Sequence, residues 1–128
     1  MRLLLETHAL LWFYLGDPQL SGAANATIVD PANEKWVSPA SYWEIAIKIS
    51  TGKYVLAEPY EDFCRNAIDA NGFQVLHILA RHTALLTTMT YHHRDPFDRL
   101  LVAQALAEGM SVVSADTILD AYGVGRVW

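Results

Sequence analysis

The sequence predicts one α/β domain built from parallel β-α-β units, and three observations support this fold class. Short apolar segments recur along the chain, separated by longer segments with helical spacing. The chain of 128 residues is long enough to bury most of the apolar surface of one core. No internal repeat, low-complexity tract or Pro/Gly/Ser-rich linker divides it, so we expect residues 1–128 to form a single domain.

The N-terminal part of the chain predicts one strand and two helices. Residues 1–5 form an apolar run typical of a buried strand, and the apolar residues of Thr7–Leu15 are too crowded for an exposed helix face. This first helix should therefore be largely buried, and the glycine, aspartate and proline at 16–18 end it. Ser21 can cap a second helix that runs toward Val29.

The middle of the chain predicts a short strand and two further helices. Residues 36–37 have the apolar character of a second strand. Ser38, which precedes a proline, is a favourable helix start, and that helix should end near Gly52. Pro59 starts another helix, which should end near Gly72.

The C-terminal half completes the predicted sheet. Residues 73–78 alternate enough for a third strand, and a helix is expected around residues 80–88. Asp95 and the following proline open a periodic helix whose apolar positions alternate between core and surface until Gly109 closes it. A fourth strand, a short helix and a terminal edge strand follow at residues 111–115, 117–121 and 126–128, so the sheet should have four to five strands.

The composition is that of a globular protein. Hydrophobic residues make up 52% of the chain and charged residues 18%, and no apolar run is long enough to cross a bilayer. Glu6 and His8 interrupt the apolar N-terminus, so we expect neither export nor a membrane anchor. The single cysteine, Cys64, cannot form an internal disulfide, which suits a cytoplasmic protein.

The net charge argues against passive binding to nucleic acid. Such binding normally depends on a basic surface, whereas this chain has a formal charge of -5. The objection weakens where acids are clustered around bound cations, because the cations invert the local field. The arrangement of the acidic residues therefore decides which function is favoured.

Four acids lie at corresponding places of the predicted fold. Glu6 follows the first strand, Glu44 lies in the helix after the second, Asp98 opens a helix, and Asp116 follows the fourth strand. In a parallel sheet these positions meet at the carboxyl edge, where ligands bind. Carboxylate oxygens suit Mg²⁺ or Mn²⁺, and without a cation the four charges would repel one another. Glu6 in particular needs a partner or an opening to water, because it ends an apolar strand.

The other acids each have a second interpretation that the sequence leaves open. Glu44 could pair with Lys48 at the helical i,i+4 spacing. Asp98 could simply favour the positive end of its helix, and Asp116 could be a cap or turn residue. For Asp95 we favour a helix cap over a metal ligand.

With these residues in place, the chain resembles the PIN-domain family, and more narrowly the VapC toxins of bacterial type II toxin–antitoxin pairs. The resemblance covers essentially the whole chain, and its third segment is very specific. Four segments carry it: LLLETHALLW (Leu3–Trp12), SYWEIAIK (Ser41–Lys48), HRDPFDRLLVAQA (His93–Ala105) and SAD (Ser114–Asp116).

The resemblance implies a three-layer α/β/α fold and a Mg²⁺- or Mn²⁺-dependent endoribonuclease that hydrolyses RNA, with transfer or ribosomal RNA as the expected target. It also implies a homodimer and inhibition by a cognate antitoxin, in a larger complex where the two assemble. Glu6, Asp98 and Asp116 would be the metal ligands, and Glu44 would bind metal or position water. The supporting residues would be Ser114, Thr7, Asp95 and Arg99.

One position departs from the family pattern, which usually has aspartate where this chain has Glu6. The extra carbon–carbon bond moves the carboxylate by roughly 1.5 Å, and Mg²⁺ demands near-octahedral geometry. The alternative function is therefore a weakened or inactive PIN-like binding domain. A receiver-like phosphoacceptor domain also gathers acids at a sheet edge, but it leaves the Asp95–Arg99 segment unexplained.

Few cations are expected to contact RNA, and the candidates are Lys48, Arg94 and Arg99. Arg99 could equally form a structural ion pair. We expect His92 and His93 to form a solvated pair before a helix, and His8 to be a packed helix residue. Several aromatic side chains could stack on bases, although core or interface positions are favoured for them: Trp12, Phe13, Tyr14, Tyr42 and Trp43.

Overall fold

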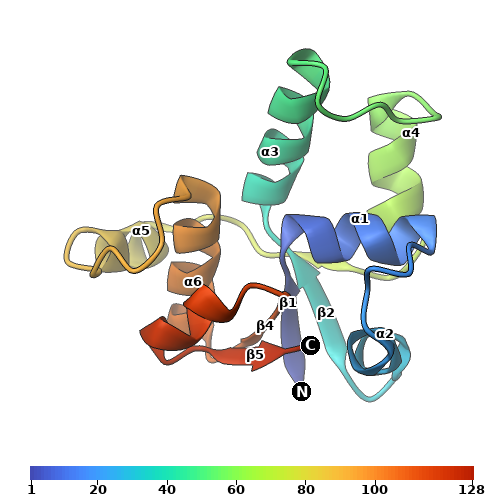
Figure 1. The fold of residues 1–128 in the computed structure, drawn as a ribbon. Coiled ribbons are helices and arrows are strands. Elements are labelled where there is room, and N and C mark those ends of the chain that lie inside the picture. The colour runs from blue at the N-terminus through green and yellow to red at the C-terminus, as the bar shows by residue number, and fades with distance from the viewer.

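A computed structural model describes residues 1–128 and shows a five-stranded sheet between two layers of helices (Figure 1). Every pair of neighbouring strands is parallel, in the order β3-β2-β1-β4-β5. This confirms the predicted three-layer α/β/α fold and its parallel sheet. The strands are β1 (Arg2–Leu5), β2 (Glu34–Val37), β3 (Gln74–Val75), β4 (Ser111–Val113) and β5 (Gly125–Val127).

Three helices begin at the cap residues that the sequence predicts. The side chains of Ser21, Ser38 and Asp95 each accept a backbone N–H from the first turn of the helix that follows. The helices are α1 (Thr7–Leu15), α2 (Gly22–Val29), α3 (Pro39–Ser50), α4 (Tyr60–Cys64), α5 (Ala80–Leu86) and α6 (Pro96–Glu108), with a π-helical turn η1 (Arg65–Asp69) after α4 and a 3₁₀ turn η2 (Thr117–Tyr122). None of them combines the length and apolar character needed to cross a bilayer.

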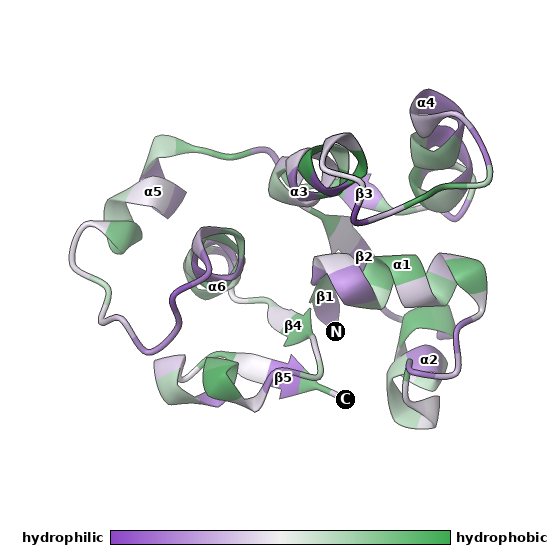
Figure 2. Ribbon diagram, turned by 45° about the horizontal axis from the view of Figure 1, so that its top comes forward, coloured by the Kyte–Doolittle hydropathy of each residue, from purple (hydrophilic) through white to green (hydrophobic).

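The central strand β1 is buried on both faces. Leu3 and Leu5 point into a cluster with residues of α1, α2, α3 and α4, whereas Leu4 points into a second cluster with residues of α6 and η2. This two-sided burial explains why β1 is an uninterrupted apolar run. Helix α1 is mostly hydrophobic but has a hydrophilic start, as Figure 2 shows, and its start adjoins the carboxyl end of β1.

Two predictions at the element level need correction. The third strand was expected at residues 73–78, but β3 contains only Gln74 and Val75. Its sole neighbour is β2, which ends at Val37 because Ser38 caps α3, so residues beyond Leu76 have no strand to pair with. Helix α6 is also less periodic than expected.

In α6, the five residues Leu101–Ala105 are all buried, although alternation between core and surface was predicted. The sheet covers one side of α6, and α5 packs against another. A helix that is enclosed on several sides has no wide exposed face, so its sequence does not alternate between apolar and polar positions.

The topology creates a crevice at the carboxyl ends of β1 and β4. The chain from β1 continues toward β2 and β3 on one side, and β4 and β5 lie on the other, so the connections diverge at this point. The Glu6 N–H donates to the Val113 carbonyl at 3.1 Å, which keeps the ends of β1 and β4 together.

Candidate metal centre

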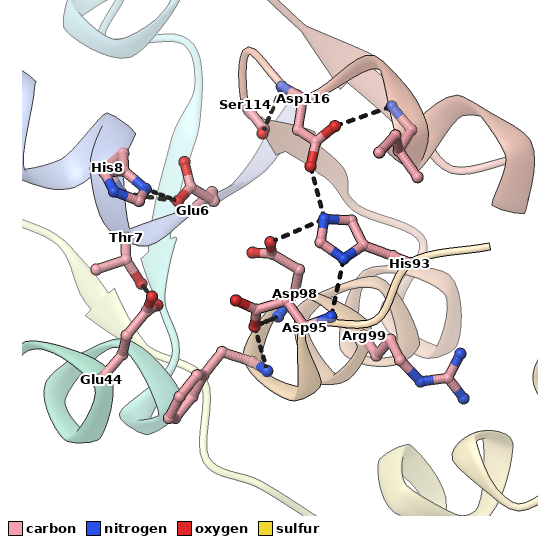
Figure 3. A network of polar contacts seen from close by, with 12 residues as sticks. Glu6, Thr7, His8, Glu44, His93, Asp95, Asp98, Arg99, Ser114 and Asp116 are labelled. Carbon is pink, nitrogen blue, oxygen red and sulfur yellow. Dashed lines mark hydrogen bonds and ion pairs between the residues drawn. The ribbon is translucent and has the colours of Figure 1, made fainter. Parts of the chain in front are cut away.

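Three side chains meet at this crevice: His93, Asp98 and Asp116. Each offers a potential ligand atom, and these atoms all lie within 4.8 Å of one another. His93 Nε2 is 2.6 Å from Asp116 Oδ2 and 3.2 Å from Asp98 Oδ2, as Figure 3 shows. Two of the four predicted acids are thus brought together, with a histidine between them.

Local structure fixes the backbone of both acids. Asp98 lies in the first turn of α6, where its N–H donates to the cap residue Asp95 at 3.1 Å. Asp116 caps η2 by accepting the Ile118 N–H at 3.0 Å, and its own N–H donates to Ser114 Oγ at 3.1 Å. The predicted cap role of Asp95 is confirmed, and buried Ser114 orders the turn that carries Asp116.

A cavity of about 330 Å³ opens in front of these side chains. Six of its eight lining residues are polar or charged, which suits a hydrated cation and a phosphate. The lining residues are Glu6, His8, Trp12, His93, Asp98, Ser114, Ala115 and Asp116.

Glu6 lies on the wall of the cavity but outside the group of three. Its carboxylate turns back onto the start of α1, where it accepts the N–H groups of His8 at 2.9 Å and Ala9 at 3.4 Å. The same carboxylate is 2.8 Å from His8 Nδ1, and this hydrogen bond is the largest cause of the raised pKa of His8. The Glu6 carboxylate thus caps α1 and binds the His8 ring.

Glu44 does not line the cavity. It is buried beside Thr7, whose hydroxyl donates to Glu44 Oε1 at 2.6 Å, and Lys48 Nζ lies 3.3 Å from Glu44 Oε2. The Glu44–Lys48 pair that the sequence left open is therefore present. Thr7 also contacts Ser41 Oγ at 3.0 Å, so this network joins α1 to α3.

The charges around Asp98 make it hard to ionise. Burial, and after it the nearby charges of Glu6 and Asp95, outweigh the lowering effect of His93 and together raise the pKa of Asp98 to about 7. A divalent cation would offset this repulsion directly. The donor set therefore fits a hard cation such as Mg²⁺ or Mn²⁺ that keeps several waters.

Arg99 does not form the structural ion pair that the sequence left open. It is buried, and its guanidinium donates to the carbonyls of Thr90 at 2.9 Å and Met89 at 3.2 Å rather than to a carboxylate. It also stacks on the Tyr91 ring, 3.7 Å from its centroid. Arg99 therefore organises the loop before α6, because these contacts satisfy that loop's backbone.

The histidine predictions were partly wrong. His92 is exposed as expected, but His93 contacts both site acids and is only 15% exposed as a side chain. His8 is half-buried rather than packed in the core, and its Nε2 lies 3.0 Å from the Tyr54 hydroxyl. The signal for His93 was its place two residues before Asp95, in the segment that also holds Asp98.

The aromatic residues divide between the core and the surface. Phe13 packs edge-on against Phe73, and Tyr14 against Phe63, so both are partly buried and pack against the core. Trp12 lines the cavity, whereas Trp43 is 65% exposed.

Comparison with known proteins identifies the family. The PIN domain family model matches residues 3–125. No curated protein sequence matches the chain.

Two solved structures have a similar fold at 14% sequence identity. One is VapBC2 from Rickettsia felis, a crystal structure bound to a DNA fragment from its promoter, with a TM-score of 0.68 over 98% of this chain and 97% of that one. The other is VapBC-1 from nontypeable Haemophilus influenzae, with a TM-score of 0.66 over 98% and 96%. Since the family model spans almost the whole sequence, this chain belongs to the PIN-domain family.

Proposed function

We propose that this protein is a divalent-metal-dependent endoribonuclease of the VapC type, the toxin of a toxin–antitoxin pair. The observation that carries the proposal is the cavity at the carboxyl ends of β1 and β4, where the carboxylates of Asp98 and Asp116 converge. The similarity to two VapBC structures and the family membership support the toxin assignment. We further propose a cytoplasmic homodimer that a cognate antitoxin neutralises.

Asp98 and Asp116 are the residues that would hold Mg²⁺ or Mn²⁺, with Glu6 across the cavity as a ligand through water or directly. A bound divalent cation would activate water and stabilise charge on the phosphate of an RNA substrate. Asp98 has to lose its proton to bind, and its raised pKa makes that loss incomplete near neutral pH.

Other residues of the cavity would orient the RNA. Trp12 forms part of the wall and offers a ring for a base to stack on. Arg94 is exposed in the segment that enters α6, where its charge could attract a phosphate. Lys48 is less available, because it is paired with Glu44.

A second function, a weakened or inactive binding domain, is favoured by one observation. The Glu6 carboxylate is engaged by His8 and by the start of α1 instead of joining Asp98 and Asp116. In the Glu6→Asp variant the shorter side chain can still cap α1, since aspartate is a favoured cap residue. Its carboxylate would then sit closer to the end of β1.

Two variants and one control variant distinguish the endonuclease from the binding domain. If the protein is an endonuclease, Glu6→Asp raises Mg²⁺- or Mn²⁺-dependent cleavage of a transfer RNA pool, by up to about a hundredfold. Asp98→Asn abolishes cleavage, and Asp62→Asn, an acid distant from the cavity on α4, leaves it unchanged. Sequencing of RNA ends measures the outcome, and an intact pool with wild type and Glu6→Asp alike would favour the binding domain.

A further inference from the structure

His93 is held at every polar atom of its side chain. Its Nδ1 accepts the backbone N–H of Asp95 at 3.0 Å, and its Nε2 lies between Asp116 and Asp98. The backbone N–H of His93 donates to the hydroxyl of Tyr122 at 2.9 Å. Figure 3 shows the ring standing between the start of α6 and the turn after β4. These contacts fix the orientation of the His93 ring.

These contacts determine which ring nitrogen carries the proton. Nδ1 uses its lone pair to accept the Asp95 N–H, so it carries no hydrogen. The proton of the ring is therefore on Nε2, from which it is donated to Asp116 Oδ2 at 2.6 Å. The contact with Asp116 agrees, because a lone pair on Nε2 would face Asp116 Oδ2 at 2.6 Å and be repelled.

A protonated nitrogen cannot be a metal ligand. Metal-bound histidine uses a free lone pair and usually donates its other N–H to a carbonyl or carboxylate. His93 has the opposite arrangement, since the nitrogen far from the acids is the acceptor. His93 therefore lies beside Asp98 and Asp116 as a hydrogen-bond donor and not as a third metal ligand.

The two acids that His93 joins come from separate elements. Asp98 is on α6, and Asp116 caps η2 after β4. No other hydrogen bond or ion pair links either carboxylate to the other acid or to a common side chain. The spacing of these oxygens before a cation arrives therefore depends on His93.

We propose that His93 is a positioning residue, which donates its Nε2 hydrogen to Asp116 and Asp98 and so sets the two carboxylates at the spacing that a divalent cation requires. The inference rests on the proposed function, in which these acids hold the metal. Residues that orient metal ligands in this way typically contribute about 10- to 100-fold to metal affinity.

The variants His93→Ala and His93→Gln test the positioning role. The Mn²⁺ affinity of each is measured by electron paramagnetic resonance on the full chain. His93→Ala removes the donor, and we expect Mn²⁺ to bind about 10- to 100-fold more weakly. His93→Gln keeps an amide N–H near the place of Nε2, and we expect it to restore most of the affinity. His92→Ala, which changes the exposed neighbour, should bind Mn²⁺ like the wild type.

Each other outcome overturns the proposal. Tighter binding in His93→Ala would mean that the imidazole occupies the place of the cation. Equal weakening in both variants, with loss of a preference for Mn²⁺ over Mg²⁺, would mean that His93 is a ligand, because imidazole nitrogen favours the transition metal. If His93→Ala does not fold, nitrogen-15 NMR of the wild-type ring decides, and a proton on Nδ1 overturns the proposal.

Asp98→Asn separates this proposal from the proposed function. If Asp98→Asn abolishes Mn²⁺ binding while His93→Ala changes nothing, the metal site stands and only the positioning role falls. If the wild type binds no Mn²⁺, both fall together.

Discussion

At the scale of single residues, Asp98 is the acid of the site whose ionisation is most disfavoured by its surroundings. Its side chain is 18% exposed, and burial together with the charges of Glu6 and Asp95 raises its pKa to about 7. In the unfolded chain the same carboxyl group titrates at its ordinary value near 4. In the absence of metal, ionised Asp98 therefore lowers the free energy of unfolding.

This shift predicts how stability depends on pH. Because the folded pKa lies above the unfolded value, the folded metal-free protein binds the extra proton, so stability from Asp98 is present below about pH 4 and is lost as pH rises through about 7. Asp98→Asn removes this loss and should stabilise the metal-free protein at about pH 8 by on the order of 2 kcal/mol.

Urea unfolding between about pH 5 and pH 8 measures the difference, with chelator present throughout. The control is Asp62→Asn, whose exposed carboxyl pairs with Arg65 on the surface of α4. Stability curves of wild type and Asp98→Asn that stay parallel over this range would show that the pKa of Asp98 is not raised.

The sequence predicted which acids lie at the site, but it did not predict the hydrogen-bond partners of their side chains. Glu6, Asp98 and Asp116 were found because acids at strand ends and helix starts meet at one sheet edge. The direction of the Glu6 carboxylate depends on the N–H groups of α1, which only the folded chain places. His93 was assigned to a solvated pair because its contacts with Asp98 and Asp116 arise only when the segment before α6 folds against the turn after β4.

At the scale of elements, one buried histidine helps to attach α5 to α6. His82 is fully buried, accepts the Leu79 N–H on Nδ1 at 3.0 Å, and contacts Glu108 Oε1 through Nε2 at 2.7 Å. Arg81 also binds Glu108, but its side chain is 63% exposed. The buried contact should therefore outweigh the exposed one.

The matched variants His82→Phe and Arg81→Ala test this difference. His82→Phe keeps the ring but leaves the Leu79 N–H and the Glu108 carboxylate without their partner, so it should cost about 1 to 3 kcal/mol. Arg81→Ala removes a surface pair and should cost under about 1 kcal/mol. Hydrogen exchange of the α5 amides reports both effects, and similar protection in the two variants would contradict the prediction.

The same elements show which parts of a fold a sequence specifies. Helices α2, α3 and α6 begin at Ser21, Ser38 and Asp95, because a cap signal is local and survives packing. Strand β3 was overestimated, since its length depends on where β2 stops. Burial of Leu101–Ala105 depends on α5, which lies elsewhere in the sequence.

At the scale of the whole molecule, the proposed function needs a cation to bind before RNA, because of how the charges are distributed. The chain has 14 acidic and 9 basic residues, and several of those bases are already paired: Lys48 with Glu44, Arg81 with Glu108, and Arg126 with Asp120. A phosphate approaching the cavity meets Asp98 and Asp116 first. A divalent cation reverses that local field, which resolves the objection that the net charge raised.

Metal binding should therefore be visible as stability of the entire fold. A cation that binds only the folded chain stabilises it by about 2.7 kcal/mol at 100 times its dissociation constant, which for a domain of this size raises Tm by roughly 10 °C. Thermal unfolding with Mn²⁺, reversed by chelator, measures the shift. Asp98→Asn should lose it, whereas Glu44→Gln should retain most of it, because Glu44 lies outside the cavity and pairs with Thr7 and Lys48. An equal shift in Asp98→Asn would place the cation elsewhere, and a shift lost in Glu44→Gln alone would make α3 part of the metal site.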